Sequence, residues 1–119
     1  MVIVDTSIWV DHLSKGCSEL EVLLHNNEVT LHPYVIGELA CGSIRNRKLI
    51  LSFLTALPSV PILTHSEYFA FIDNNKLMGI GLGFVDIHIL GSALLSETKV
   101  FTRDKALLQA SEKLRLRYC

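Results

Sequence analysis

The sequence predicts an α/β fold in which a mostly parallel sheet is covered by helices on both faces. Short β-branched or apolar runs alternate along the chain with longer segments whose apolar residues recur at helical spacing. The length of 119 residues leaves room for one domain, which we expect to span residues 1–119. Half of the residues are hydrophobic and 19% are charged, which favours a folded chain over a disordered one.

The element boundaries carry recognisable start and stop signals. Ser18 and Thr64 each precede a glutamate by three residues, which is the spacing of a helix capping box. Pro33 suits the first turn of a helix, and the three glycines of segment 77–83 predict a loop. We therefore expect strands at 2–4, 29–32, 60–63 and 99–102, and helices at 6–16, 18–26, 33–42, 49–57, from 64, 84–96 and 106–114.

Membrane insertion, export and disulfide bonding are not expected. The longest uncharged apolar run, 77–85, is far shorter than the ~20 residues of a spanning helix. The N-terminus lacks a basic segment and reaches Asp5 before an apolar stretch can form. The three cysteines are odd in number and form no C-x-x-C pair, so we expect a cytoplasmic protein.

Two acidic residues follow predicted strands. Asp5 comes directly after the strand 2–4, and Asp104 lies just beyond the strand 99–102. The carboxyl ends of parallel strands meet at one edge of the sheet, which is the usual ligand site of open α/β folds. Taken singly, each acid is better explained as a helix N-cap.

Asp86 falls on the apolar face of its predicted helix. At 100° per residue it points the same way as Leu90 and Ala93, so we expect it to face inward. A buried, unpaired carboxylate is costly, and it needs a cation, several hydrogen-bond donors or a raised pKa. An inward residue that caps the start of the helix is the competing explanation. His88 falls on the opposite, polar face, and we expect it to be solvated.

Glu38 lies off the centre of its helix's apolar stripe, which by itself predicts an exposed residue. Three acids that converge on one crevice repel each other unless divalent cations compensate, and Mg²⁺ or Mn²⁺ binds carboxylate oxygens readily. A fourth oxygen donor such as Glu38 fits this arrangement. Solvent exposure is the better explanation for Asp11, Asp73, Glu97 and Glu112.

Four short motifs resemble, in order and spacing, those of PIN-domain ribonucleases, and most closely the VapC-type toxins of toxin-antitoxin pairs. The motifs are Val2-Ile3-Val4-Asp5-Thr6-Ser7-Ile8-Trp9, Gly37-Glu38-Leu39, Gly83-Phe84-Val85-Asp86-Ile87-His88-Ile89-Leu90 and Thr102-Arg103-Asp104-Lys105. The resemblance covers essentially the whole chain and implies a PIN fold. It also implies that Asp5, Glu38, Asp86 and Asp104 hold Mg²⁺ or Mn²⁺, with Thr6 and Thr102 as supporting hydroxyls.

The resemblance implies hydrolysis of RNA phosphodiester bonds, in which the cation lowers the pKa of the attacking water. The products would carry 5′-phosphate and 3′-hydroxyl ends, and no histidine or lysine is needed as a general base. Some family members carry a further acid where this chain has Leu107, so a second metal ion would be held weakly. The resemblance also implies a homodimer and a cognate VapB-type antitoxin that places a basic side chain among the acids.

The formal net charge of −1 includes the four predicted site acids, and the rest of the chain is basic. Without the four site acids the chain has 11 basic and 8 acidic residues, a charge of +3. Arg45, Arg47 and Lys48 form the densest basic cluster and are candidates for contacts with RNA phosphates, as is Arg103. Solvation is the preferred explanation for the basic residues near the C-terminus.

The aromatic residues favour an interface, although a larger core would explain them too. They are Trp9, Tyr34, Phe53, Tyr68, Phe69 and Phe71. Two other functions remain open. A receiver-like Mg²⁺-binding signalling domain has a similar length and acids at strand ends, but it needs paired acids after the first strand and a mid-chain Asp, and this sequence has neither. A catalytically inactive PIN binding module is the second alternative.

Overall fold

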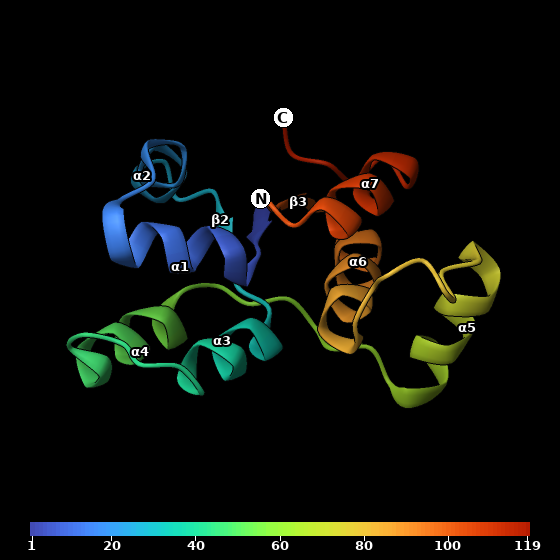
Figure 1. The fold of residues 1–119 in the computed structure, drawn as a ribbon, viewed down its shortest axis with the longest axis horizontal. Helices are drawn as coiled ribbons and strands as arrows, with labels where there is room; N and C mark the ends of the chain where they lie inside the picture. Colours follow the sequence, from blue (N-terminus) through green and yellow to red (C-terminus); the bar gives the residue numbers. More distant parts are fainter.

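A three-stranded parallel sheet lies at the centre of the computed structural model, which describes residues 1–119 (Figure 1). The strands are β1 (Val2–Val4), β2 (Val29–Thr30) and β3 (Lys99–Phe101), in the order β2-β1-β3. In the register, Ile3 lies between Thr30 on one side and Val100 on the other. β1 is buried along its whole length, as expected for the central strand of a parallel sheet covered on both faces.

Seven helices surround the sheet. They are α1 (Thr6–Lys15), α2 (Ser18–His25), α3 (Pro33–Ala40), α4 (Arg47–Ala56), α5 (His65–Asn75), α6 (Phe84–Ser96) and α7 (Lys105–Lys113). The order and type of the helices are as predicted, and α6 has the predicted bounds. In Figure 1, α1 and α3 lie on one side of β1 and β3, and α6 and α7 lie on the other.

The predicted strand 60–63 is wrong. A single parallel bridge joins Leu31 to Ser59, and the chain then continues without regular structure. Pro61 has no backbone N–H to donate to a ladder, so pairing cannot extend through it. The apolar residues Val60 and Leu63 are buried nevertheless, because they pack into the core from a coil segment.

Of the two predicted capping boxes, one is confirmed. Thr64 and Glu67 exchange side-chain and backbone hydrogen bonds at 2.7 and 3.1 Å at the start of α5. The predicted box at Ser18 and Glu21 is wrong, because Cys17 is the N-cap of α2 and the Ser18 hydroxyl donates to Glu19 instead.

The core meets the sheet along α6, whose residues from Ile87 to Ala93 are all buried. Gly91 permits close packing there, since a Cβ atom added to it would lie 2.3 Å from Leu63 Cδ1. The C-terminal segment completes the core on the far side of β3. The Val100 backbone N–H donates to Leu116, and the Tyr118 backbone N–H donates back to Val100.

His88 is buried, at 3% exposure, which corrects the prediction that it is solvated. Helix α5 packs on the face of α6 that the helical periodicity left to solvent, and it brings Tyr68 parallel to the His88 ring at 4.6 Å between ring centres. Tyr34 and Phe84 complete an aromatic cluster around the ring. The wheel of an isolated helix cannot show this second packed face.

Of the aromatic residues that the sequence analysis singled out, some lie in the core and others lie on the surface. Trp9 and Phe71 are buried, whereas Phe53 and Phe69 are largely exposed. None of the helices combines the length and the apolar character needed to cross a membrane.

Candidate active site

Four carboxylates come from four different elements. Asp5 directly follows β1, Glu38 lies in α3, Asp86 lies in the first turn of α6, and Asp104 is the N-cap of α7. We call these four residues the acidic quartet. Because β1 and β3 are parallel neighbours, Asp5 and Asp104 leave the sheet at the same edge, as predicted.

Asp5 is 5% exposed, and two hydroxyl groups hold its carboxylate. Ser7 Oγ and Thr102 Oγ1 donate to Asp5 Oδ2 at 2.8 and 2.7 Å. The same hydroxyls accept the successive backbone N–H groups of Arg103 and Asp104, at 3.1 and 3.0 Å. Asp5 occupies the N-cap position of α1, as predicted, but its side chain makes no capping hydrogen bond, so capping does not account for the placement of its carboxylate.

Ser7 is the site residue that the sequence reasoning missed. Its hydroxyl links Asp5, in the same chain segment, to the turn that carries Asp104. The sequence signal is its position two residues after Asp5, inside the Asp5-Thr6-Ser7 motif, but the spacing alone does not show the partner at Arg103.

Asp104 caps its own helix, since Oδ2 accepts the backbone N–H of Leu107 at 2.9 Å. The N-cap explanation is therefore right for this residue. Leu107, where some related sequences have an acid, is completely buried.

Glu38 is exposed, as predicted, and it is bound to α1 through the Thr6 hydroxyl, which donates to Glu38 Oε1 at 2.6 Å. Thr6 thus supports Glu38, whereas Thr102 supports Asp5. Thr6 and Glu38 line a groove of about 830 Å³ between α1 and the segment from Glu38 to Ile50, which we call the α1 groove.

Asp86 is half-buried, and its Oδ2 accepts the backbone N–H of Gly83 at 2.9 Å. Burial raises the pKa of the Asp86 carboxyl above its ordinary value, and the Gly83 N–H opposes this shift. The negative charges of Asp5, Asp104 and Glu38 raise the pKa further. All three other members of the quartet therefore act electrostatically on Asp86, which is what a shared site requires.

Each carboxylate of the quartet keeps one oxygen free of protein hydrogen bonds. Asp5, Asp86 and Asp104 accept only through Oδ2, and Glu38 accepts only through Oε1. Four carboxylates with uncommitted oxygens match the ligand preference of Mg²⁺ and Mn²⁺. As the side chains stand, no group of three or more His, Cys, Asp or Glu is arranged to hold an ion. The fit of a divalent cation therefore rests on the donor chemistry and on the shared negative field.

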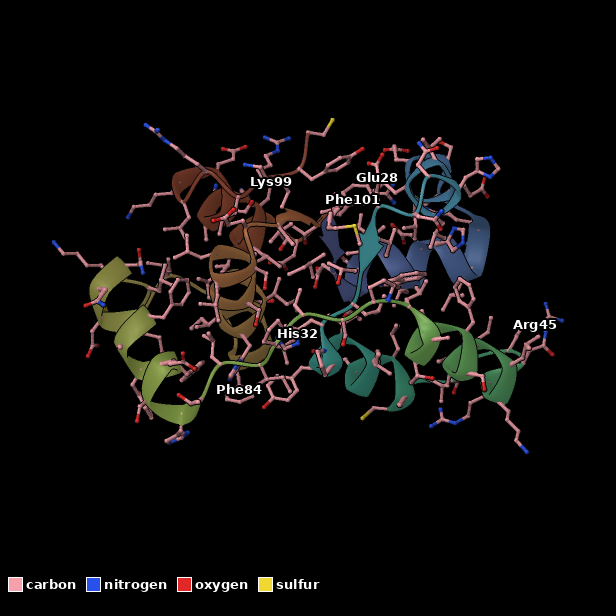
Figure 2. All side chains as sticks on the ribbon, turned by 180° about the vertical axis from the view of Figure 1, so that it is seen from behind. Glu28, His32, Arg45, Phe84, Lys99 and Phe101 are labelled. Atoms are coloured by element: carbon pink, nitrogen blue, oxygen red, sulfur yellow. The ribbon has the colours of Figure 1, made fainter.

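The predicted RNA-contacting residues divide into two groups. Arg45, Arg47 and Lys48, which we call the basic cluster, are exposed at the start of α4, and Figure 2 shows Arg45 at the end of the molecule away from Phe84. Arg45 lines the α1 groove together with Glu38, whereas Arg47 and Lys48 lie outside it on the adjoining surface of α4. Arg103 lies beside Asp104, and its guanidinium donates to Asp11.

Comparison with known proteins agrees with this architecture. The PIN domain family matches residues 2–113. Ribonuclease VapC32 of Mycobacterium tuberculosis is 43% identical over 111 residues, which cover 92% of this chain and 90% of that protein.

Two solved structures share the fold at low sequence identity. FitAcB from Neisseria gonorrhoeae aligns with a TM-score of 0.65 at 18% identity, over 94% of both chains. VapBC2 from Rickettsia felis, bound to a DNA fragment from its promoter, aligns with a TM-score of 0.68 at 22% identity, over 87% of this chain and 88% of that chain. With a family match along nearly its whole length and a closely similar ribonuclease, the chain belongs to the PIN-domain family.

Proposed function

We propose that the protein is a toxin endoribonuclease, which hydrolyses RNA phosphodiester bonds with Mg²⁺ or Mn²⁺ and is neutralised by a cognate VapB-type antitoxin. The observation that carries the proposal is that Asp5 and Asp104 leave neighbouring parallel strands at one edge of the sheet, where two hydroxyl groups hold the Asp5 carboxylate. The pKa of Asp86, raised by burial and then by the charges of Asp5, Asp104 and Glu38, supports the same grouping. The 43% identical relative is a ribonuclease by name, which supports the reaction class.

The acidic quartet would hold the cation through its uncommitted oxygens. When bound, the cation supplies the positive charge that activates water and stabilises the leaving oxygen of a phosphodiester. Ser7 and Thr102 fix the Asp5 carboxylate so that Oδ2 faces the protein, and Thr6 fixes Glu38 in the same way through Oε1. These hydroxyls therefore orient the ligands before any ion arrives.

A histidine base is not part of the proposal. His32 and His88 are buried in the aromatic cluster of α3, α5 and α6, so neither can approach an RNA phosphate without unpacking it. The expected products carry 5′-phosphate and 3′-hydroxyl ends.

The first test is metal dependence of cleavage by highly purified protein. We expect cleavage of single-stranded RNA with Mn²⁺ or Mg²⁺, none with EDTA, and recovery when the metal is restored in excess. Mapping the ends of the products checks the expected chemistry. Protein that binds RNA but never cleaves it at any metal concentration contradicts the enzyme assignment and favours an inactive PIN binding module.

The basic cluster predicts a specific salt dependence of RNA binding. Replacing Arg45, Arg47 and Lys48 by alanine is expected to reduce the slope of log affinity against log salt by about 2, since each lost phosphate contact removes about 0.7 on single strands. The measurement is a salt titration of RNA binding by fluorescence anisotropy in EDTA.

Matched controls exist at the C-terminus. Lys113, Arg115 and Arg117 are also exposed, and we expect their alanine triple variant to keep the wild-type slope. Equal slopes for the two triple variants contradict the assignment of the basic cluster to phosphate contacts.

The α1 groove suits the antitoxin. Its wall includes the apolar residues Val10, Leu13 and Ile44, and Glu38 lies at its edge, so an extended peptide could bury apolar side chains and bring a basic one to the acids. We also propose a homodimer, because Phe53 and Phe69 remain exposed. RNA and antitoxin are cytoplasmic partners, which agrees with the expected location.

Residues 1–119 act as one unit in this proposal. The family match ends at residue 113, but Leu116 is buried, and Tyr118 pairs with both the backbone of Val100 and the ring of Phe101. The last residues are therefore part of the packing that supports β3 and, through it, Asp104.

A further inference from the structure

An ion pair joins α1 to the turn that precedes α7. The Arg103 guanidinium donates through Nη1 to Asp11 Oδ2 and through Nη2 to Cys17 Sγ, the latter at 3.5 Å. The side chains of Arg103 and Asp11 are 42% and 30% exposed. The prediction that Asp11 is simply solvated is therefore wrong, because its carboxylate is engaged in a contact between two elements.

Arg103 is held at both ends by the same face of α1. Its backbone N–H donates to Ser7 Oγ, and its guanidinium donates to Asp11. Ser7 and Asp11 are four residues apart, which places them one above the other on a helix. The turn 102–104 is thus fixed against α1 at two points, one turn of helix apart.

The two elements joined in this way carry two members of the acidic quartet. Asp5 is the N-cap of α1, and Asp104 is the N-cap of α7. The Asp104 side chain hydrogen-bonds only within its own helix, to Leu107, so its placement relative to Asp5 depends on the turn 102–104. The two carboxylates repel each other, and an attachment outside the site resists their separation.

We propose that Asp11 and Arg103 form a positioning pair that holds the Asp104-bearing turn against the start of α1 and so limits how far the carboxylates of Asp5 and Asp104 can separate. Neither side chain touches the reacting atoms. The pair acts on the distance between Asp5 and Asp104, in addition to the bonds made by Ser7 and Thr102. This role rests on the proposed metal-dependent function of the same site.

The test compares Asp11→Asn with Glu112→Gln. The control removes the same kind of ion pair, because Glu112, near the end of α7, pairs with the exposed Arg117 of the C-terminal segment. Mn²⁺ affinity is measured by electron paramagnetic resonance, and cleavage is measured under single turnover as a function of Mn²⁺ concentration.

We expect Asp11→Asn to weaken Mn²⁺ binding about threefold to fivefold, which corresponds to a partly exposed ion pair. The cleavage rate should return to near the wild-type value at saturating Mn²⁺, and RNA affinity in EDTA should not change. Asp11→Glu, which keeps the charge, should recover most of the lost metal affinity. Glu112→Gln should behave as wild type in every measurement.

A double-mutant cycle with Arg103→Gln separates the pair from a direct RNA contact. If both residues act through the pair, the double variant binds Mn²⁺ no more weakly than either single variant. The proposal is overturned if Asp11→Asn binds Mn²⁺ as wild type does, or if Arg103→Gln alone weakens RNA binding in EDTA and leaves metal affinity intact. Wild-type protein that takes up no Mn²⁺ at all overturns the proposed function instead, so the two failures are distinguishable.

Discussion

Asp86→Asn is expected to reduce the rate of RNA cleavage by about 10³-fold, because a metal centre contributes several kcal/mol of charge stabilisation that the remaining ligands cannot replace. The substitution keeps the size of the side chain and an oxygen that can accept the Gly83 N–H, so the start of α6 should stay intact. The measurement is single-turnover cleavage at saturating Mn²⁺. A rate within tenfold of wild type contradicts the assignment of Asp86 as a ligand.

Although Asp86→Asn should lose activity, we expect it to keep or gain thermal stability in the absence of metal. Burial, and after it the charges of Asp5, Asp104 and Glu38, raise the pKa of Asp86, so ionised Asp86 is disfavoured in the folded, metal-free protein. Removing its charge relieves this repulsion, and we expect the metal-free variant to melt at or above the wild-type temperature in EDTA. Mn²⁺ should raise the melting temperature of the wild type more than that of the variant.

Asp73→Asn is the matched control, because Asp73 is an exposed aspartate on α5, outside the quartet. It should change neither cleavage nor the response to Mn²⁺. An inactive Asp86→Asn variant that also melts well below wild type would indicate misfolding, and Asp5→Asn then tests the same centre from β1.

The sequence was sufficient to predict the sheet edge as the site, and the reason is local. Asp5 and Asp104 follow strands that their apolar residues identify in the sequence. Parallel pairing of these strands then brings both acids to the same edge of the sheet. The placement of Asp86 was also predictable from helical periodicity, since an acid on an apolar face needs a partner. The position of Glu38 on its helix did not distinguish it from any exposed glutamate, so it was identified as a fourth oxygen donor for a cation and through the resemblance.

What the sequence could not show depends on contacts between distant segments. Ser7 and Asp11 bind Arg103 across more than 90 residues of chain, and no local pattern encodes that pairing. His88 was expected in solvent because α5 has no signal that directs it onto α6. In both cases the deciding interaction is tertiary, and the helical wheel reports only the face of a helix in isolation.

His32 is completely buried in a chain of hydrogen bonds that requires its neutral form. The Tyr34 backbone N–H donates to His32 Nδ1 at 3.0 Å, so the ring proton lies on Nε2 and is directed at Ser92 Oγ, 3.2 Å away. Ser92 Oγ in turn donates to the carbonyl oxygen of Pro61 at 2.7 Å. Protonation at Nδ1 would place two donors, Nδ1–H and the Tyr34 N–H, against each other.

Burial, followed by the nearby His88, lowers the pKa of His32 from 6.5 to about 4. The folded state therefore binds this proton less readily than the unfolded chain does. Its contribution to stability is fully present above pH 6.5 and is lost as the pH falls from 6.5 towards 4. We expect a loss of about 3 kcal/mol in the free energy of unfolding over this interval. The raised pKa of Asp86 acts in the opposite direction, since its protonation favours the folded state.

The pH series should therefore be measured by urea unfolding of metal-free protein in the Asp86→Asn background, where the opposing group is absent. His32→Asn keeps an acceptor for the Tyr34 N–H but cannot titrate, so we expect a less stable protein at pH 7 whose stability falls much less between pH 6.5 and 4. His25→Asn is the control, because His25 is exposed at the end of α2. If His32→Asn and His25→Asn lose stability with the same slope, the buried imidazole is not the group that limits folding in acid. A much shallower profile for His32→Asn alone instead identifies the His32–Ser92–Pro61 chain as the acid-sensitive connection between α3, α6 and the coil segment before α5. The slope that remains in this variant belongs to His88, because burial lowers the pKa of His88 as well.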